Sequence, residues 1–416
     1  MIIKYISKIF CEIFVADKGQ NSEKTIPTNL SCCKSSDVCY NKNKNQQENP
    51  ILITIQNTHN TAVIYADIID GGTEGMLREF CGLPLSADSR IRVMPDVHAG
   101  KGCVIGLTMT VTDCVAPGLI GVDIGCGILA VRLDAKRLDL QKLDKLIHEK
   151  IPAGRNVRTK PHRFAEKAEL ERLLCYRHIQ ADKAHASIGT LGGGNHFIEV
   201  DRSGDGSYWL IVHSGSRHLG AETANFYQRE AYRQDDSGPY EFACLTGDGM
   251  TAYLHDLAVV QEFAALNRRA IADEIVRGMK ADVAETVECV HNYIDTEEMI
   301  LRKGAISAKD GERVVIPMNM RDGCLLGIGK GNAEWNCSAP HGAGRIISRA
   351  ETRDHFTLSQ YKKEMKGIYT TSVSRETLDE SPMAYKPMEA IVGKIGETVD
   401  VVERMTPVYN FKTGEE

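Results

Sequence analysis

The sequence lacks a long hydrophobic run. No stretch approaches the roughly 20 uninterrupted apolar residues of a membrane helix. Segment 1–15 is apolar, but Lys4, Lys8 and Glu12 interrupt it, and no small-residue cleavage site of a signal peptide follows. Basic residues are not in excess either, since the chain has 50 Lys and Arg against 56 Asp and Glu, and its net charge is −6. We therefore expect a cytoplasmic protein without membrane spans, in which any polyanion is bound by a local cluster of cations.

The cysteines do not form the pattern of a disulfide framework. Their number, 13, is odd, and they are scattered along the chain, which favours a reducing compartment. Four of them, with an Asn- and Lys-rich run at 41–49, fall in the first 50 residues. A small zinc site there is the alternative, but these four do not form Cys-x-x-Cys pairs. We predict that 1–50 is a disordered extension.

Residues 51–412 contain no Pro- or Ser-rich linker and no regular repeat. Apolar runs predict strands at 91–94, 104–111, 128–133 and 208–212. Helical spacing predicts a helix at 140–151, stopped by Pro152, and a longer one from about 257 to 290. The inner stripe of the longer helix is expected to be Val276, Met279, Val283, Val287 and Val290. The predicted fold class is α+β, with one large mixed domain over 51–416.

A glycine-flanked turn, Gly121-Val-Asp-Ile-Gly-Cys-Gly, carries two potential metal ligands. Asp123 and Cys126 are three residues apart, and the short glycine-rich backbone lets a carboxylate and a thiolate converge on one point. The structural alternative for Cys126 alone is a buried small residue.

Three histidines extend this set. His196 follows a run of three glycines, His213 ends a predicted strand, and His291 ends the long predicted helix. Each one alone is typical of a hydrogen-bonded core histidine. Together with the carboxylate and the thiol they favour a two-ion metal centre with a bridging thiolate.

His341 lies in Ala339-Pro-His-Gly-Ala-Gly-Arg. Small neighbours allow phosphates to approach backbone amides, and Arg345 offers a fork for phosphate oxygens. An imidazole nitrogen can attack phosphorus and form a reactive phosphoramidate. The alternative is a glycine-rich turn before a helix that begins near Ile346.

Two further residues are candidates for phosphate or hydroxyl contacts. Arg217, four residues after His213, is a second phosphate fork. Asp96, in Met94-Pro-Asp-Val-His-Ala-Gly-Lys-Gly, is a candidate general base or hydroxyl-orienting group. Its structural alternative is a turn-forming Asp after Pro95.

Taken together, these motifs resemble those of the RtcB-type RNA ligases. The resemblance rests on six segments that occur in the family's order and span about 51–412. They are Met94-Pro-Asp-Val-His-Ala-Gly-Lys-Gly, Gly121-Val-Asp-Ile-Gly-Cys-Gly, Gly192-Gly-Gly-Asn-His-Phe-Ile-Glu, Val212-His-Ser-Gly-Ser-Arg, His291-Asn-Tyr and Pro340-His-Gly-Ala-Gly-Arg.

The resemblance implies a GTP- and manganese-dependent reaction. The family guanylylates one histidine, here His341, in the presence of two Mn²⁺ ions, and moves GMP to an RNA 3′-phosphate. An RNA 5′-hydroxyl then displaces GMP. The RNA 3′ end begins as a 2′,3′-cyclic phosphate, and cleaved tRNA is one candidate substrate. Archease, a small activating protein, is a possible partner.

The same resemblance assigns residues to roles. Asp96 and Arg217 correspond to contacts with the RNA end and its phosphate. The expected metal ligands are Asp123, Cys126 (bridging), His196, His213 and His291. The expected nucleotide contacts are Asn195, Glu199, Gly342, Ala343, Gly344, Tyr385 and Lys412.

Two other classes of protein stay open. A metal-dependent phosphodiesterase that opens cyclic phosphates without ligation needs the metal ligands but has no use for His341. A non-catalytic RNA-binding protein tolerates a broken ligand set, whereas every expected ligand is present here.

Overall fold

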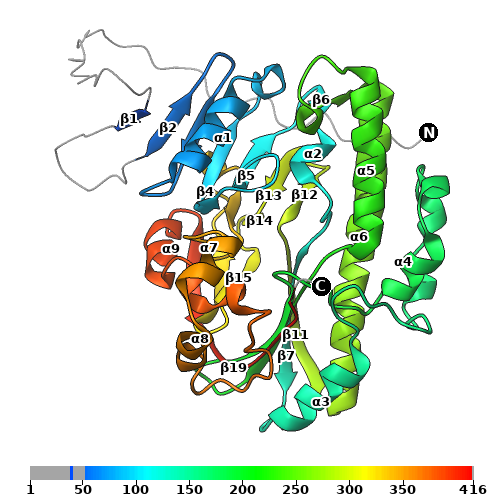
Figure 1. The fold of residues 1–416 in the computed structure, drawn as a ribbon, viewed down its shortest axis with the longest axis vertical. Coiled ribbons are helices and arrows are strands. Elements are labelled where there is room, and N and C mark those ends of the chain that lie inside the picture. Colours follow the sequence, from blue (N-terminus) through cyan, green and yellow to red (C-terminus); the bar gives the residue numbers. More distant parts are fainter. Residues whose placement is uncertain (1–37, 41–51, 415–416) are drawn as a thin grey trace, which may run out of the picture. The chain divides into compact units, whose positions relative to one another are not determined.

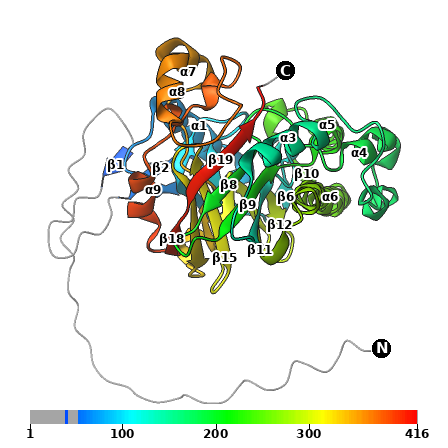
Figure 2. The same ribbon diagram turned by 90° about the horizontal axis from the view of Figure 1, so that it is seen from below.

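The strands predicted at 128–133 and 208–212 lie side by side in a five-stranded antiparallel sheet. Its strands are β7 (Gly127–Asp134), β8 (Phe197–Arg202), β9 (Tyr208–Ser214), β11 (Asp282–Val290) and β19 (Thr406–Lys412). Their order is β11-β7-β9-β8-β19, and Figure 2 shows them running next to one another. The computed structural model describes residues 38–40 and 52–414.

Both faces of the middle of this sheet are covered, which explains why β7 and β9 contain near-continuous apolar runs. Leu129, Val131 and Leu133 of β7 point to one face and pack against Ile271 and Ile275 of the long helix α6 (Gly247–Met279). The alternate residues of β7 point to the other face. They pack against a three-stranded sheet made of β15 (Arg313–Asn319), β16 (Gly323–Gly329) and β18 (Val399–Arg404), and against α9 (Met388–Ile395).

The strands predicted at 91–94 and 104–111 belong to a second, seven-stranded sheet, ordered β1-β2-β3-β4-β5-β13-β12. Only β3 and β4 pair in parallel. The bounds are β1 (Val38–Tyr40), β2 (Ile53–Gln56), β3 (Thr61–Ile64), β4 (Ile91–His98), β5 (Ile105–Thr110), β12 (Asn292–Asp295) and β13 (Ile300–Lys303). Two short pairs complete the strands: β6 (Cys114–Val115) with β10 (Leu245–Thr246), and β14 (Ala305–Ser307) with β17 (Ser338–Pro340).

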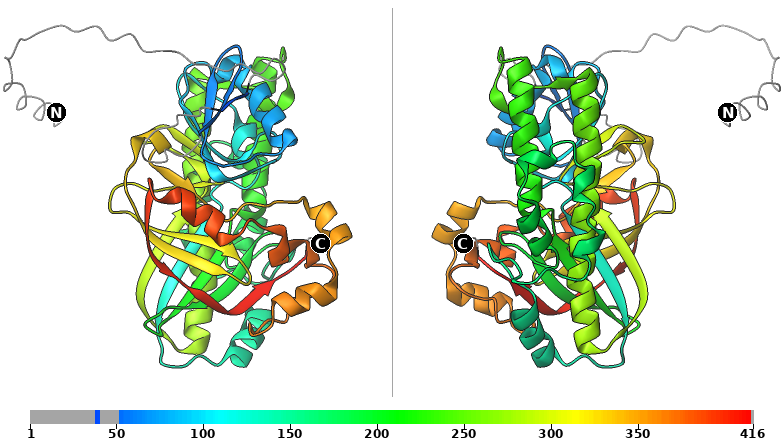
Figure 3. Two further views of the ribbon diagram at one scale, coloured as in Figure 1. Left: turned by 90° about the vertical axis from the view of Figure 1, so that its left-hand side faces the viewer. Right: turned by 90° about the vertical axis from the view of Figure 1, so that its right-hand side faces the viewer.

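Helices surround these sheets. The longest, α5 (Arg217–Gln234) and α6, pack against each other and lie toward the viewer in the right-hand view of Figure 3. Helix α1 (Gly71–Cys81) packs against β2 and β3, and the short α2 (Pro117–Ile120) packs against α5 and β13. Figure 1 shows α1 beside β2. The others are α3 (Leu140–Lys150), α4 (Ala181–Ser187), α7 (Arg349–His355) and α8 (Leu358–Glu364).

One element differs from the sequence prediction. The helix predicted over about 257–290 begins earlier, at Gly247, and ends at Met279, where Lys280 adopts a left-handed conformation with φ 56°. The chain then forms β11, which pairs along its length with β7. The predicted inner stripe therefore divides between a helix and a strand, and His291 follows a strand rather than a helix.

The described residues from 52 onward form one mixed α and β domain, as expected for the α+β class. The prediction that 1–50 is disordered concerns residues that, apart from β1, lie outside the described ones, and it stays a prediction. Among the described helices, none has the length and apolar character needed to cross a bilayer.

Candidate metal and nucleotide site

Strand register brings four predicted metal ligands to the same end of the five-stranded sheet. His291 directly follows β11, Cys126 directly precedes β7, His213 lies near the end of β9, and His196 directly precedes β8. In the antiparallel register Val290 pairs with Gly127, Gly127 with Ser214, and His213 with Phe197. Residues distant in sequence therefore form a row along one edge.

The turn before β7 adds the carboxylate. Gly121 and Gly125 have φ values of 73° and 72°, and the Cys126 amide donates to the Asp123 carbonyl at 3.2 Å. Asn292 holds the same turn by donating to the Asp123 carbonyl at 2.9 Å. The chain opposite passes so close that a Cβ on Gly215 would lie 2.2 Å from Asp123 Oδ1. The Asp123 carboxylate is thus packed tightly against Gly215, in the segment that follows His213.

The ligand atoms converge closely. Cys126 Sγ lies 3.4 Å from His196 Nε2 and 3.2 Å from His213 Nε2. His213 Nε2 lies 3.0 Å from His291 Nε2, and His196 Nε2 lies 3.7 Å from Asp123 Oδ2. Two groups result, Asp123–Cys126–His196 and Cys126–His213–His291, each with ligand atoms within 4.8 Å of one another. Cys126 is common to both, as expected for a bridging thiolate.

The histidines are oriented for ligation through Nε2. The Nδ1 atom of His196 donates to the Leu191 carbonyl at 2.9 Å, and that of His213 donates to the Asn195 carbonyl at 3.1 Å. A carbonyl partner of this kind fixes the tautomer and leaves the Nε2 lone pair for a metal. The donor set therefore fits two divalent ions that accept nitrogen, oxygen and sulfur ligands.

The protonation states agree with that fit. Burial lowers the pKa of His213 and His291 well below the usual value, so both rings are neutral at pH 7. Burial alone would raise the pKa of Asp123, but the hydrogen bond and charge of His196 bring it to about 2. Burial and the Asp123 carboxylate raise the pKa of the Cys126 thiol, and a bound cation reverses this effect by favouring the thiolate.

His341 lies beside this centre, with its ring centroid 4.8 Å from that of His291. Its Nδ1 lies 2.6 Å from Oδ2 of Asp96, a fully buried residue within β4, and its backbone amide donates to the same oxygen at 3.2 Å. Asp96 therefore does not form the turn that was its structural alternative. Since the carboxylate engages Nδ1, Nε2 is the nitrogen available for attack.

The backbone around His341 leaves no room for larger residues. Gly344 has φ 72°, and a Cβ there would lie 2.1 Å from the Asp96 carbonyl oxygen. The structural alternative placed a helix from about Ile346 after this turn, whereas the next helix begins at Arg349. The glycine segment is thus a packed loop against β4.

A cavity of about 860 Å³ opens in front of His341. It brings together all seven residues expected to contact the nucleotide and two of the expected metal ligands. These residues are Asn195, Glu199, His213, His291, Gly342, Ala343, Gly344, Tyr385 and Lys412. A second cavity, of about 570 Å³, reaches Asp123 and His196 and shares Asn195 and Arg349 with the first. The metal groups thus lie between two open spaces.

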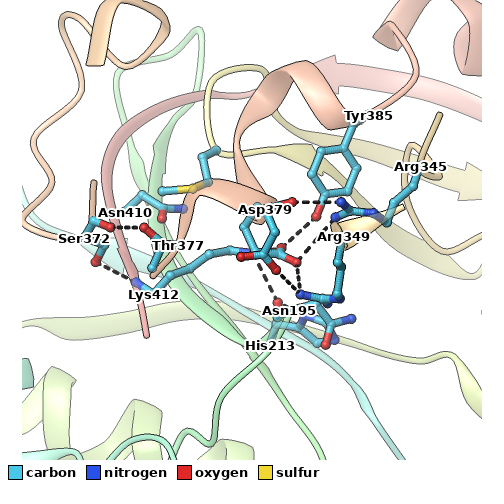
Figure 4. A network of polar contacts seen from close by, with 12 residues as sticks. Asn195, His213, Arg345, Arg349, Ser372, Thr377, Asp379, Tyr385, Asn410 and Lys412 are labelled. Atoms are coloured by element: carbon cyan, nitrogen blue, oxygen red, sulfur yellow. Dashed lines mark hydrogen bonds and ion pairs between the residues drawn. The ribbon is translucent and has the colours of Figure 1, made fainter. Parts of the chain in front are cut away.

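Figure 4 shows Arg345, Arg349 and Lys412 gathered around Asp379. The next residue, Glu380, lines the main cavity. Lys412 and Arg349 form ion pairs with Glu380, and the Tyr385 hydroxyl donates to it at 2.7 Å. Burial by itself would raise the pKa of Glu380, but Lys412 and Arg349 hold it at about 2. The cavity wall therefore contains an ionised Glu380 paired with Arg349 and Lys412.

Arg345 and Arg217, both predicted to bind phosphate, form hydrogen bonds with protein groups. Arg345 lines the cavity, but its guanidinium donates to the carbonyls of Ile347 and Asp379 and to the Thr352 hydroxyl. Arg217 is not among the residues that line either cavity, and it donates to the Gly154 carbonyl at 2.9 Å. Their phosphate contacts stay predictions.

Sequence reasoning missed several residues at the site. Lys303 is buried beside the Asp123 turn, where its Nζ donates to the Leu119 carbonyl at 2.7 Å. Its signal in the sequence was a lysine directly before glycine, at the end of Ile300-Leu-Arg-Lys-Gly. Glu380 and Arg349 were missed because they lie in polar segments without a distinctive spacing.

Comparisons with known proteins agree with this geometry. A family model described as "tRNA-splicing ligase RtcB" matches residues 77–413. The RNA-splicing ligase RtcB of Escherichia coli (strain K12) is 31% identical over 390 residues, which cover 80% of this chain and 95% of that protein. The tRNA-splicing ligases RtcB of Aeropyrum pernix and Archaeoglobus fulgidus are 28% and 27% identical, over 76% and 75% of this chain and 86% and 83% of those proteins. This chain belongs to the RtcB family.

Proposed function

We propose that this chain is an RNA ligase that joins an RNA 2′,3′-cyclic phosphate or 3′-phosphate end to a 5′-hydroxyl end through a GMP adduct of His341. The observation that carries the proposal is the position of His341. Its Nδ1 is held by Asp96 at 2.6 Å, and its ring lies against the metal ligand His291. A nucleophilic imidazole needs this orientation, because one nitrogen must keep a lone pair directed at phosphorus.

The metal proposed for the centre is Mn²⁺, two ions held by Asp123, Cys126, His196, His213 and His291. When bound, these ions would neutralise the triphosphate and polarise the phosphorus under attack. This chain's residues supply the alignment. The backbone of the Gly342–Gly344 segment lines the cavity beside His341 and lets phosphates approach closely.

GTP is the proposed co-substrate in the main cavity. Glu199 and Lys412 offer a buried acceptor and a buried donor for the polar edge of a base, while Tyr385 offers an aromatic face. Asn195 is exposed between the two cavities, where it can reach the nucleotide or the RNA end.

The proposed sequence has four steps. His341 Nε2 attacks the α-phosphorus of GTP and releases pyrophosphate. Water opens the RNA cyclic phosphate to a 3′-phosphate. An oxygen of that phosphate attacks the His341-bound GMP, which frees the imidazole. The RNA 5′-hydroxyl then attacks the activated 3′-phosphate, loses its proton and releases GMP. Asp96 keeps the imidazole in place during the two steps in which a bond to His341 forms or breaks.

The wider assignments belong to the same proposal. RNA is the substrate class, and cleaved tRNA is one candidate. An activating partner of the archease type and a cytoplasmic location stay predictions.

The decisive experiment is incubation of the purified chain with GTP and Mn²⁺, followed by measurement of the intact mass. We expect a gain of one GMP that is lost in His341→Ala and kept in His355→Ala, whose histidine is exposed on α7. A ligation assay with cyclic-phosphate and 5′-hydroxyl RNA should follow the same pattern. If wild type forms no adduct yet opens cyclic phosphates, the protein is a phosphodiesterase and the proposal is wrong.

A further inference from the structure

The middle of α6 carries two polar residues in a place that usually holds apolar ones. Asn267 and Arg268 are both fully buried. A buried amide or guanidinium costs free energy unless its hydrogen-bonding groups are satisfied. Helix α6 packs against β7 and β9, and Figure 1 shows it beside β7. The partners of these two side chains therefore indicate what the helix does for the site.

Arg268 joins three segments that carry metal ligands. Its Nη1 donates to the carbonyl of Gly125 at 2.7 Å and to that of Ser214 at 3.0 Å. These residues stand directly before Cys126 and directly after His213. Its Nη2 and Nε donate to Oε1 of Glu288, on β11, at 2.8 and 3.1 Å.

Glu288 provides a fixed counter-charge three residues before His291. Burial on its own would favour the neutral acid, but Arg268 and Arg269 hold the pKa of Glu288 below its usual range. The Arg268 fork is therefore held rigidly from the side opposite the metal ligands. A guanidinium held in this way fixes two carbonyls at a defined separation, which a lysine ammonium does not do.

Asn267 serves the neighbouring segments in a similar way. Its Oδ1 accepts from the amides of Gly189 and Thr190 at 2.8 and 3.1 Å. Its Nδ2 donates to the carbonyls of Thr190 and Gly215, both at 3.1 Å, and to Ser214 Oγ at 3.0 Å.

These contacts lead directly to the remaining ligands. Leu191, next to Thr190, supplies the carbonyl that orients His196, and the Ser214 hydroxyl donates to that same carbonyl at 2.8 Å. Gly215 is the residue packed against the Asp123 carboxylate. Asn267 thus holds the backbone segments that contact His196 and Asp123, the two ligands that Cys126 joins in the first metal group.

We propose that Asn267 and Arg268 are positioning residues of the metal centre. They hold the backbones beside Asp123, Cys126, His196 and His213 so that the ligand atoms meet before an ion arrives. The inference rests on the proposed metal centre and extends it to residues that touch no ligand atom. Pre-organisation of this kind raises metal affinity, because binding then orders fewer groups.

The same helix offers a matched control. Asp256 is also fully buried, and its carboxylate accepts from the amides of Leu174 and Cys175 and from the Tyr227 hydroxyl. Those partners belong to segments that carry none of the proposed ligands. Replacing Asp256 should therefore destabilise the fold without changing metal affinity.

The test is a Co²⁺ titration of the metal-free, full-length chain, with absorption bands of tetrahedral Co²⁺ and of thiolate-to-Co²⁺ charge transfer as readouts. We expect Arg268→Lys and Asn267→Ala to weaken Co²⁺ binding by about 10–100-fold, the usual cost of losing an outer support of a metal site. Their charge-transfer band should also shift or weaken. Asp256→Asn should lower the thermal midpoint to a similar degree and keep the wild-type affinity and spectrum.

Three results would count against the inference. Wild-type affinity and spectrum in Arg268→Lys and Asn267→Ala would overturn the positioning role and leave the metal centre intact. An equal loss of affinity in Asp256→Asn would show that general destabilisation is the cause. Failure of the wild type to bind Co²⁺ would refute the metal centre itself, and the positioning role with it.

Discussion

Replacing Asp96 by Asn tests how the nucleophile is held. The Asp96 Oδ2 atom accepts from both Nδ1 and the backbone amide of His341, and the carboxylate is fully buried. Asparagine has nearly the same shape and can still accept from Nδ1, but it carries no charge. The substitution therefore removes the electrostatic part of the contact while it leaves most of the packing in place.

The magnitude follows from the kind of hydrogen bond that is lost. A bond to a charged group contributes about 1.5–3 kcal/mol and a neutral bond about 1 kcal/mol, so the difference is about 1–2 kcal/mol. The His341 ring becomes positively charged as its Nε2 bonds to phosphorus, so the loss falls on the transition state. With about 1.4 kcal/mol for each factor of ten, guanylylation should slow by about 5–30-fold. If the amide instead donates to Nδ1, the tautomer is wrong and the loss approaches about 10⁴-fold.

The assay is a single-turnover measurement of GMP transfer from GTP to His341. Asp144→Asn is the control, because Asp144 is also buried but bonds the hydroxyls of Thr371 and Tyr409 away from the cavity. We expect Co²⁺ or Mn²⁺ binding by Asp96→Asn to match that of the wild type. A guanylylation rate within twofold of wild type in Asp96→Asn would refute the role given to this carboxylate.

Three other perturbations test separate parts of the site. Cys126→Ser should lower the bound Mn²⁺ measured by elemental analysis from two ions toward one or none, because a hydroxyl bridges poorly; unchanged metal content would remove Cys126 from the site. Gly344→Ala should abolish the GMP adduct and lower the free energy of unfolding in urea by at least about 1–3 kcal/mol, because Gly344 has positive φ and the added Cβ would overlap the Asp96 carbonyl. Gly393→Ala is the control and should be tolerated, because the added Cβ would meet open space. Glu380 has a folded pKa of about 2 against a usual 4.5, so its stabilisation is complete above pH 5 and is lost as the pH falls toward 2. Urea unfolding at pH 5 and at pH 2.5 should therefore show a steeper loss in wild type than in Glu380→Gln, by up to about 3 kcal/mol, and equal losses would contradict the ionised state of Glu380.

The proposed metal ligands could be picked out because their signals are local. Asp123 and Cys126 share one glycine-flanked turn, and His213 ends an unmistakable apolar strand. The convergence of these side chains could not be predicted from their spacing. It depends on the antiparallel register, which puts the start of β7 beside the end of β9. The register is a property of paired strands and is absent from any single segment.

The error over 257–290 has a physical cause. Val276, Val283, Val287 and Val290 follow a helical spacing, but all four are β-branched residues that also suit a strand, and the last three lie in β11. In β11 only the alternate residues Val287 and Cys289 are buried, as a half-covered strand requires. Pairing with β7 therefore decided the outcome, and this tertiary contact overrode the periodicity.

Buried polar residues such as Asn267 and Arg268 were beyond sequence reasoning for another reason. On the sequence they read as one turn of the polar face of a helix. Their partners lie from 20 to 143 residues away, in strands and loops whose positions only the fold defines. Polar residues that satisfy distant backbone groups look the same in sequence as polar residues that face water.

The chain's passage between its two main sheets explains why His341 and the proposed metal ligands meet. His291 is the single residue between β11, in the five-stranded sheet, and β12, in the seven-stranded sheet. Its amide donates to the Cys126 carbonyl at 2.9 Å, and its own carbonyl accepts from Gly304 at 2.7 Å. Gly304 separates β13 from β14, and β14 pairs with β17, the strand that ends directly before His341. His291 and His341, the proposed metal ligand and the proposed nucleophile, are therefore connected through a few backbone hydrogen bonds. A shift of one sheet against the other would change the distance over which phosphorus must be transferred, so the packing between the sheets is itself part of the catalytic geometry.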